Sequence, residues 1–271
     1  MKDLLKYAKS LLIDAHSDLD KAIGDNNKKA LHLFRLDVKK ITALEELLSF
    51  CYDTKILTDK KLNKLFKLCG KVRESNTHLM NINKYLNIKN KEAITLKKAL
   101  KKKVKNHYTK LSDQYKKKNE KVFIKTNQWI NKTLKNPARH KLQDYFLMKQ
   151  KKILGLLLQL PGNNEHIHNF RKEIKSYIHN TEGLYHLKPY HLINLKILQK
   201  WDTILGDWCD AIKSTEEIEK LLNKFRKDKK LYTAMQKLKI NLISERNTLL
   251  KKFLTQADSQ LLILMNRGTR V

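Results

Sequence analysis

Two segments of this chain place a histidine, an arginine and a lysine at the same spacing. The two sets are His32, Arg35 and Lys39, and His168, Arg171 and Lys175. On a helix, at about 100° per residue, three side chains spaced in this way fall within about 60° of one another. Imidazole, guanidinium and ammonium groups all donate hydrogen bonds to anionic oxygens. We interpret each set as a helix face that contacts phosphate.

Each face belongs to an amphipathic helix whose opposite side is apolar. Leu31, Phe34 and Val38 lie opposite the first face, and Ile167 and Phe170 lie opposite the second. Neighbouring basic residues extend both faces, and Arg73 lies one helical turn after Gly70 on a later helix. The candidate phosphate-binding residues are Lys28, His32, Arg35, Lys39, Lys40, Arg73, Lys101, His168, Arg171, Lys172 and Lys175.

The composition predicts a polyanionic partner. The 271 residues include 58 Lys and Arg against 27 Asp and Glu, a formal charge of +31. Nucleic acid, an acidic membrane surface and a phosphate polymer are all polyanions that a chain of this charge would attract. Three cysteines without a CxxC pair indicate reduced thiols. No apolar run reaches the roughly 18–20 residues of a membrane span. We expect a cytoplasmic protein without membrane insertion.

Apolar periodicity predicts an all-α chain, with glycine and proline at the helix boundaries. No segment shows the sustained alternation of a strand. The expected helices span about 2–23, 28–52, 58–86, 91–134, 138–160, 164–181, 190–225 and 230–265.

The two halves of the sequence resemble each other at a constant offset. His168, Arg171 and Lys175 each lie 136 residues after their counterparts, and Gly206 lies 136 residues after Gly70. We therefore predict an internal duplication with pseudo-twofold symmetry, in which residues 1–136 and 137–271 form two four-helix bundle-like repeats. Gly70 and Gly206 lie inside helices, and we interpret them as points where two helices approach closely.

Several kinds of site are not expected. Neither histidine has a second histidine four residues later, so no zinc pair is predicted, and no nucleophile stands at a spacing suited to catalysis. The run Lys116–Lys118 is interpreted as a solvated helix face. The run around Lys101 is equally compatible with solvent and with the anion-binding surface. Trp129, Trp201 and Trp208 are spaced as core residues and do not form stacking platforms for bases.

The chain resembles the conserved histidine α-helical domain (CHAD) family in these motifs. The resemblance rests on the segments His32–Lys40, Cys69–Glu74, His168–Lys175 and Leu205–Asp210. It implies two four-helix units with a basic surface between them that binds inorganic polyphosphate. Family members are usually richer in arginine. This chain has Lys39, Lys40 and Lys175, and it has Thr42, Ser176 and Ile178 at further positions that are basic in the family. The chain has no Glu-x-Glu-x-Lys signature, which would indicate a fused triphosphate-hydrolysing domain.

We therefore expect a stand-alone, non-enzymatic domain without a cofactor. It would bind polyphosphate along a basic groove between the repeats, with both faces acting together, and it could associate with polyphosphate granules. The first alternative is a basic helical protein associated with nucleic acid. The second is a phosphohydrolase that processes polyphosphate.

Overall fold

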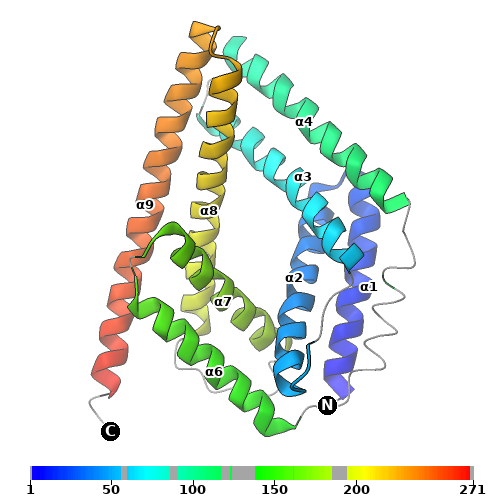
Figure 1. The fold of residues 1–271 in the computed structure, drawn as a ribbon, viewed down its shortest axis with the longest axis vertical. Helices are drawn as coiled ribbons and strands as arrows, with labels where there is room; N and C mark the ends of the chain where they lie inside the picture. Colours follow the sequence, from blue (N-terminus) through cyan, green and yellow to red (C-terminus); the bar gives the residue numbers. More distant parts are fainter. Residues whose placement is uncertain are drawn as a thin grey trace. The chain divides into compact units, whose positions relative to one another are not determined.

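The computed structural model describes residues 2–55, 60–85, 91–116, 123, 138–160, 162–184 and 194–268. Helices account for the regular structure of these ranges, and no strand occurs in them, which confirms the predicted all-α class. The helices, labelled as in Figure 1, are α1 (Lys2–Gly24), α2 (Lys28–Cys51), α3 (Lys60–Tyr85), α4 (Lys91–Lys116), α6 (Arg139–Leu158), α7 (Asn164–Gly183), α8 (Leu195–Lys224) and α9 (Lys229–Gly268).

Most predicted helix ends agree with the structure to within a few residues, and side-chain caps stabilise two of the helix starts. Asn27 caps α2, where its side chain accepts hydrogen bonds from the backbone N–H groups of Lys29 and Ala30. Asn194 caps α8 in the same way. The long helix predicted over 91–134 is described only as far as Lys116. Its remainder, with Trp129 and most of the run Lys116–Lys118, lies outside the described residues.

The chain divides into two compact units, and each unit combines residues from both predicted repeats. Unit 1 comprises Met1–Ser75, Lys102–Gln150 and Ser176–Leu192. Unit 2 comprises Asn76–Lys101, Lys151–Lys175 and Ile193–Val271. Helices α3, α4, α6 and α7 therefore each contribute residues to both units.

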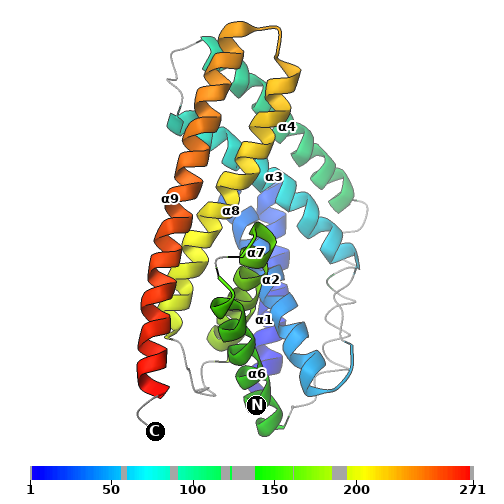
Figure 2. The ribbon, with the colours of Figure 1, turned by 60° about the vertical axis from the view of Figure 1, so that its left-hand side comes forward.

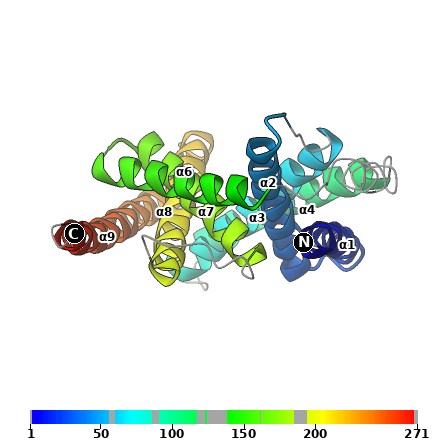
Figure 3. The same cartoon turned by 90° about the horizontal axis from the view of Figure 1, so that it is seen from below.

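Unit 1 contains the helix pair α1 and α2, which lie side by side near the N-terminus (Figure 3). Leu19 of α1 and Phe34 of α2 are fully buried in its core. Aromatic rings of α6 and α7 complete this core. The ring centroid of Phe146 lies 5.6 Å from that of Tyr145 and 5.8 Å from that of Tyr177. This packing buries the apolar side of α2 and leaves its opposite side available for function.

Unit 2 contains the long helix pair α8 and α9, which lie side by side in Figures 1 and 2. One apolar cluster combines residues of α3, α4, α8 and α9: Ile82, Leu96, Leu100, Ile218, Leu221, Leu222, Leu231, Met235, Leu238 and Leu242. Elsewhere in the unit, Trp201 of α8 packs against both Phe170 of α7 and Phe253 of α9. Its ring centroid lies 6.0 Å and 5.8 Å from theirs. This contact fixes the apolar side of α7 against α8.

Candidate functional site

The first basic face lies on α2 in unit 1. Burial of Leu31, Phe34 and Val38 orients this helix, so that His32 and Lys28 on its other side are exposed. The remaining α2 candidates are Arg35, Lys39 and Lys40, and all three are half-buried. The α2 face thus combines exposed donors with cations held close to the protein surface.

Helix α3 fixes the position of the Arg35 side chain. Its Nη1 donates a hydrogen bond of 2.7 Å to the Phe66 carbonyl, and the guanidinium carbon lies 4.2 Å from the centroid of the Phe66 ring. A Cβ atom added at Gly70 would lie 2.8 Å from Arg35 Nη1. Gly70 therefore makes room for the guanidinium, which refines its interpretation as a point of close helix approach.

Lys40 lies beside an acidic residue of its own helix. Its Nζ is 3.7 Å from Asp37 Oδ1. Burial, opposed by Lys40, raises the pKa of Asp37 to about 6, and Asp18 and Asp14 also raise it. At neutral pH the carboxylate is ionised and offsets part of the Lys40 charge.

The second basic face lies on α7 in unit 2, where Arg171 and Lys175 share one carboxylate. Arg171 Nε lies 3.1 Å from Asp202 Oδ1, and Lys175 Nζ lies 2.9 Å from Asp202 Oδ2. Arg171 Nε also donates to the backbone carbonyl of Asp202, at 3.4 Å. A Cβ atom at Gly206 would lie 3.0 Å from Arg171 Nη2, so this glycine also accommodates a guanidinium.

His168 is exposed on the α7 face, together with Lys172. Its Nδ1 lies 3.9 Å from the Sγ atom of Cys209. Desolvation of the ring, followed by the positive charges of Lys172 and Arg171, lowers the pKa of His168 below its ordinary value. The imidazole is therefore neutral near pH 7, and a nearby anion would favour its protonated form.

The candidate residues divide between the two units. Unit 1 holds Lys28, His32, Arg35, Lys39, Lys40 and Arg73, and unit 2 holds Lys101, His168, Arg171, Lys172 and Lys175. Arg73 is half-buried on α3, the helix that positions Arg35. Lys101 is exposed on α4, directly after Leu100 of the apolar cluster of unit 2.

His107 of α4, which the sequence interpretation omitted, contacts α3, the helix that positions Arg35. In unit 1, its Nδ1 lies 2.9 Å from Ser75 Oγ and 3.2 Å from the backbone oxygen of Lys71. Desolvation, followed by the charge of Lys103, lowers the pKa of His107. The available signal was the spacing of Lys103, His107 and Lys110, which places all three on one side of α4.

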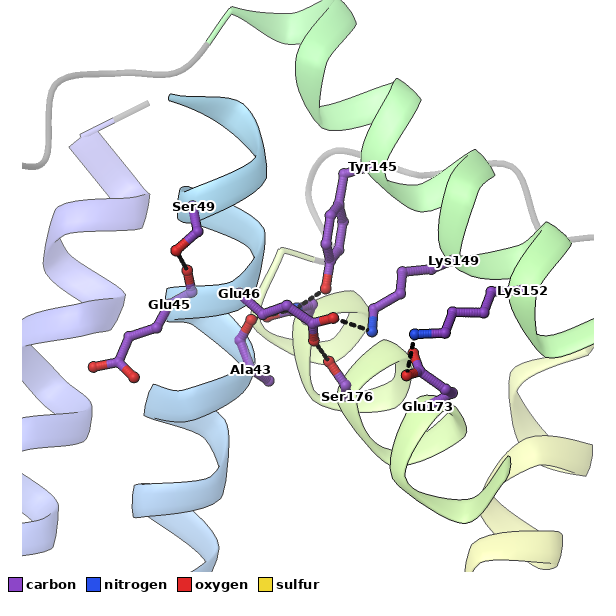
Figure 4. A network of polar contacts seen from close by, with 10 residues as sticks. Ala43, Glu45, Glu46, Ser49, Tyr145, Lys149, Lys152, Glu173 and Ser176 are labelled. Atoms are coloured by element: carbon purple, nitrogen blue, oxygen red, sulfur yellow. Dashed lines mark hydrogen bonds and ion pairs between the residues drawn. The ribbon is translucent and has the colours of Figure 1, made fainter. Parts of the chain in front are cut away.

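A polar network inside unit 1 links α2, α6 and α7 (Figure 4). The buried ammonium group of Lys149 donates to Glu46 Oε1, and Ser176 Oγ donates to Glu46 Oε2 at 2.6 Å. Asn180 Nδ2 donates to the Ala43 carbonyl at 2.8 Å and to the Tyr145 hydroxyl at 2.9 Å. The network connects α2 to α6 and α7 within unit 1.

The described residues contain neither a cluster suited to a metal ion nor a helix suited to a membrane span. Among the side chains that the structure describes, no group of three or more His, Cys, Asp or Glu residues could hold a metal ion. Within the described helices, none combines the length and apolarity needed to cross a membrane.

No family model matches the sequence, and no curated protein matches it either. The structure is similar to the crystal structure of the CHAD domain from the plant Ricinus communis, with a TM-score of 0.75 and 13% identity over 95% of this chain and 91% of that chain. It is also similar to PptA from Streptomyces chartreusis, with a TM-score of 0.68 and 12% identity over 95% of this chain and 98% of that chain. At these identities the likeness concerns the fold. The chain therefore has a CHAD-type, all-helical fold, as its histidine and glycine motifs predicted.

Proposed function

We propose that this protein binds inorganic polyphosphate through the α2 and α7 faces and does not catalyse a reaction on it. One observation carries the proposal. In each unit an arginine is held against a backbone carbonyl and beside a glycine, on the same face as an exposed histidine. A guanidinium held in this way loses little conformational freedom when it contacts phosphate.

The charge of the chain supports the same ligand. A linear phosphate polymer carries about one charge per unit and presents no base edges, so ordered cations suffice to bind it. With a formal charge of +31, the chain also attracts nucleic acid. The two ligands differ in how much of their binding depends on the particular cations of the α2 and α7 faces.

Titration of the full chain with long-chain polyphosphate, single-stranded RNA and duplex DNA at physiological salt tests this proposal. We expect polyphosphate to bind more tightly than either nucleic acid at equal phosphate concentration. Equal or tighter binding of nucleic acid would contradict the proposal and favour the nucleic-acid alternative. Phosphate release in the presence of Mg²⁺ or Mn²⁺ would contradict the non-enzymatic part and favour a phosphohydrolase.

A matched pair of double variants tests the assigned residues. Arg35→Ala with Arg171→Ala removes two charges from the basic faces, whereas Lys251→Ala with Lys252→Ala removes two charges from exposed positions on α9. We expect the arginine pair to weaken polyphosphate binding by at least about tenfold, because a charge-assisted hydrogen bond is worth about 1.5–3 kcal/mol. The α9 pair removes only long-range attraction. Equal losses in both double variants would show that binding depends on total charge alone.

A further inference from the structure

The backbone positions next to the two arginines are equivalent, but their side chains differ in charge. Arg35 donates to the carbonyl of Phe66, and Arg171 donates to the carbonyl of Asp202. The donor and the acceptor are 31 residues apart in both cases, and Asp202 lies 136 residues after Phe66. An aromatic ring in unit 1 thus takes the place that a carboxylate takes in unit 2.

The Asp202 carboxylate forms ion pairs with two cations of the α7 face. Its two oxygens contact Arg171 and Lys175 separately, and the side chains of all three residues are only 20% exposed. Phosphate oxygens seek the same donors in the same geometry. A phosphate that approaches Arg171 must therefore compete with this carboxylate or bind beside its negative charge.

Other corresponding positions near the two faces are also more basic around the α2 face than around the α7 face. At the 136-residue offset, four basic residues on or near the α2 face correspond to neutral or acidic ones: Lys28 to Asn164, Lys40 to Ser176, Lys71 to Asp207, and Arg73 to Cys209. Two positions near the α7 face differ in the opposite direction, because Lys172 corresponds to Leu36, and Lys213, whose charge acts on His168, corresponds to Thr77. On balance, the surroundings of the α2 face are more positive than those of the α7 face.

Building on the proposed function, we propose that the α2 face supplies most of the affinity for polyphosphate, and that Asp202 is the residue that keeps the affinity of the α7 face low. Asp202 has two effects. It orders Arg171 and Lys175 in the absence of ligand, and it offsets their charge when a polyanion approaches. The two repeats have therefore diverged into a strong and a weak phosphate-binding face.

Single substitutions in the full chain test the inference, with long-chain inorganic polyphosphate as the probe. Arg35→Gln should weaken binding by about tenfold or more, since it removes a preorganised charge-assisted donor. Arg171→Gln should weaken it by no more than about twofold, because Asp202 already offsets that charge. Asp202→Asn should tighten binding by about fivefold by releasing two cations.

Glu219→Gln provides the matched control for Asp202→Asn. Glu219 also lies on α8 in unit 2, where it pairs with Lys239 of α9 at 2.8 Å, away from the residues of the α7 face. Both substitutions raise the net charge by one, so any effect of total charge is common to them. Circular dichroism spectra of the Asp202→Asn and Arg171→Gln proteins establish that the helices are intact.

The possible outcomes separate this inference from the proposed function. Equal losses for Arg35→Gln and Arg171→Gln would overturn it, as would an Asp202→Asn affinity equal to that of Glu219→Gln or below that of the unmodified protein. In each of these cases, tight binding by the unmodified protein would leave the proposed function standing. Failure of the unmodified protein to bind polyphosphate would overturn the proposed function itself.

Discussion

Substitution of Gly70 by alanine tests how the Arg35 guanidinium is held. The new Cβ atom would lie 2.8 Å from Arg35 Nη1, closer than such atoms approach in real structures. The clash involves the far end of a flexible side chain, so the helices can stay in place while the guanidinium moves. To move, it must leave the carbonyl of Phe66 at 2.7 Å and the ring of Phe66 at 4.2 Å.

The expected cost of Gly70→Ala follows from these contacts. A hydrogen bond from a charged donor contributes about 1.5–3 kcal/mol, and a cation–π contact contributes about 0.5–2 kcal/mol. Alanine in place of a helical glycine returns about 1 kcal/mol. Because the half-buried guanidinium regains some hydration, we expect a net loss of about 1–3 kcal/mol in the free energy of unfolding. Polyphosphate affinity should fall by about tenfold, because a guanidinium that is free to move must be ordered again on binding.

Urea denaturation and polyphosphate titration of the same preparations measure both effects. Gly155→Ala is the matched control, because Gly155 lies within α6 and an added Cβ there meets nothing within 4 Å. This control should raise the free energy of unfolding by up to about 1 kcal/mol and leave binding unchanged. If Gly70→Ala stabilises the protein as Gly155→Ala does and binds polyphosphate normally, Gly70 has no part in placing the guanidinium.

Three further predictions concern stability and are measured by chemical or thermal denaturation. Asp37→Asn should stabilise the protein at pH 7, by up to about 3 kcal/mol, because a pKa raised from 3.8 to about 6 makes ionisation of the native carboxyl unfavourable. That advantage should shrink as the pH falls from about 6 to about 4, and a constant difference would contradict the raised pKa. Glu46→Gln should lower the free energy of unfolding by about 2 kcal/mol, and by more than Lys149→Met does. Lys149 is 1% exposed and Glu46 is 44% exposed, so loss of the glutamate charge leaves a buried, unpaired ammonium, whereas loss of the lysine charge leaves a carboxylate that water can hydrate. A larger loss of stability for Lys149→Met than for Glu46→Gln would show that Lys149 contributes through packing and not through its charge. Phe253→Ala should cost about 3–5 kcal/mol, since this ring is fully buried against Phe170 and Trp201. A loss below about 1 kcal/mol would mean that the cluster collapses to fill the space.

The sequence predicted the helices and, for α2 and α7, the side that is buried, because both follow from the period of the apolar residues. It also identified Arg35 and Gly70 as motif residues, but it did not predict that one accommodates the other. Helical periodicity describes a single helix, and the contact between α2 and α3 depends on how two helices pack.

Two other features were detectable in the sequence and were missed. Lys149 occupies a core position in the pattern Leu142, Tyr145, Phe146, Lys149 and Ile153, and the structure buries it accordingly. A lysine in such a pattern is easily read as a break in the apolar stripe, because buried lysines require a partner that the sequence alone does not reveal. Asp202 was not predicted, because its counterpart Phe66 is apolar and the likeness between the two halves gives no signal at this position.

The composition of unit 2 has a consequence for how the chain folds during synthesis. Its apolar cluster combines Ile82, Leu96 and Leu100 of α3 and α4 with residues of α8 and α9, which are synthesised after them. Until α8 and α9 are made, these apolar side chains have no counterpart to bury them, so a nascent chain that ends near residue 136 cannot complete either of the two units. Folding that requires contacts so distant in sequence is slow and leaves apolar surface exposed for longer. Each of the two units can therefore complete its fold only after segments beyond residue 136 have been made.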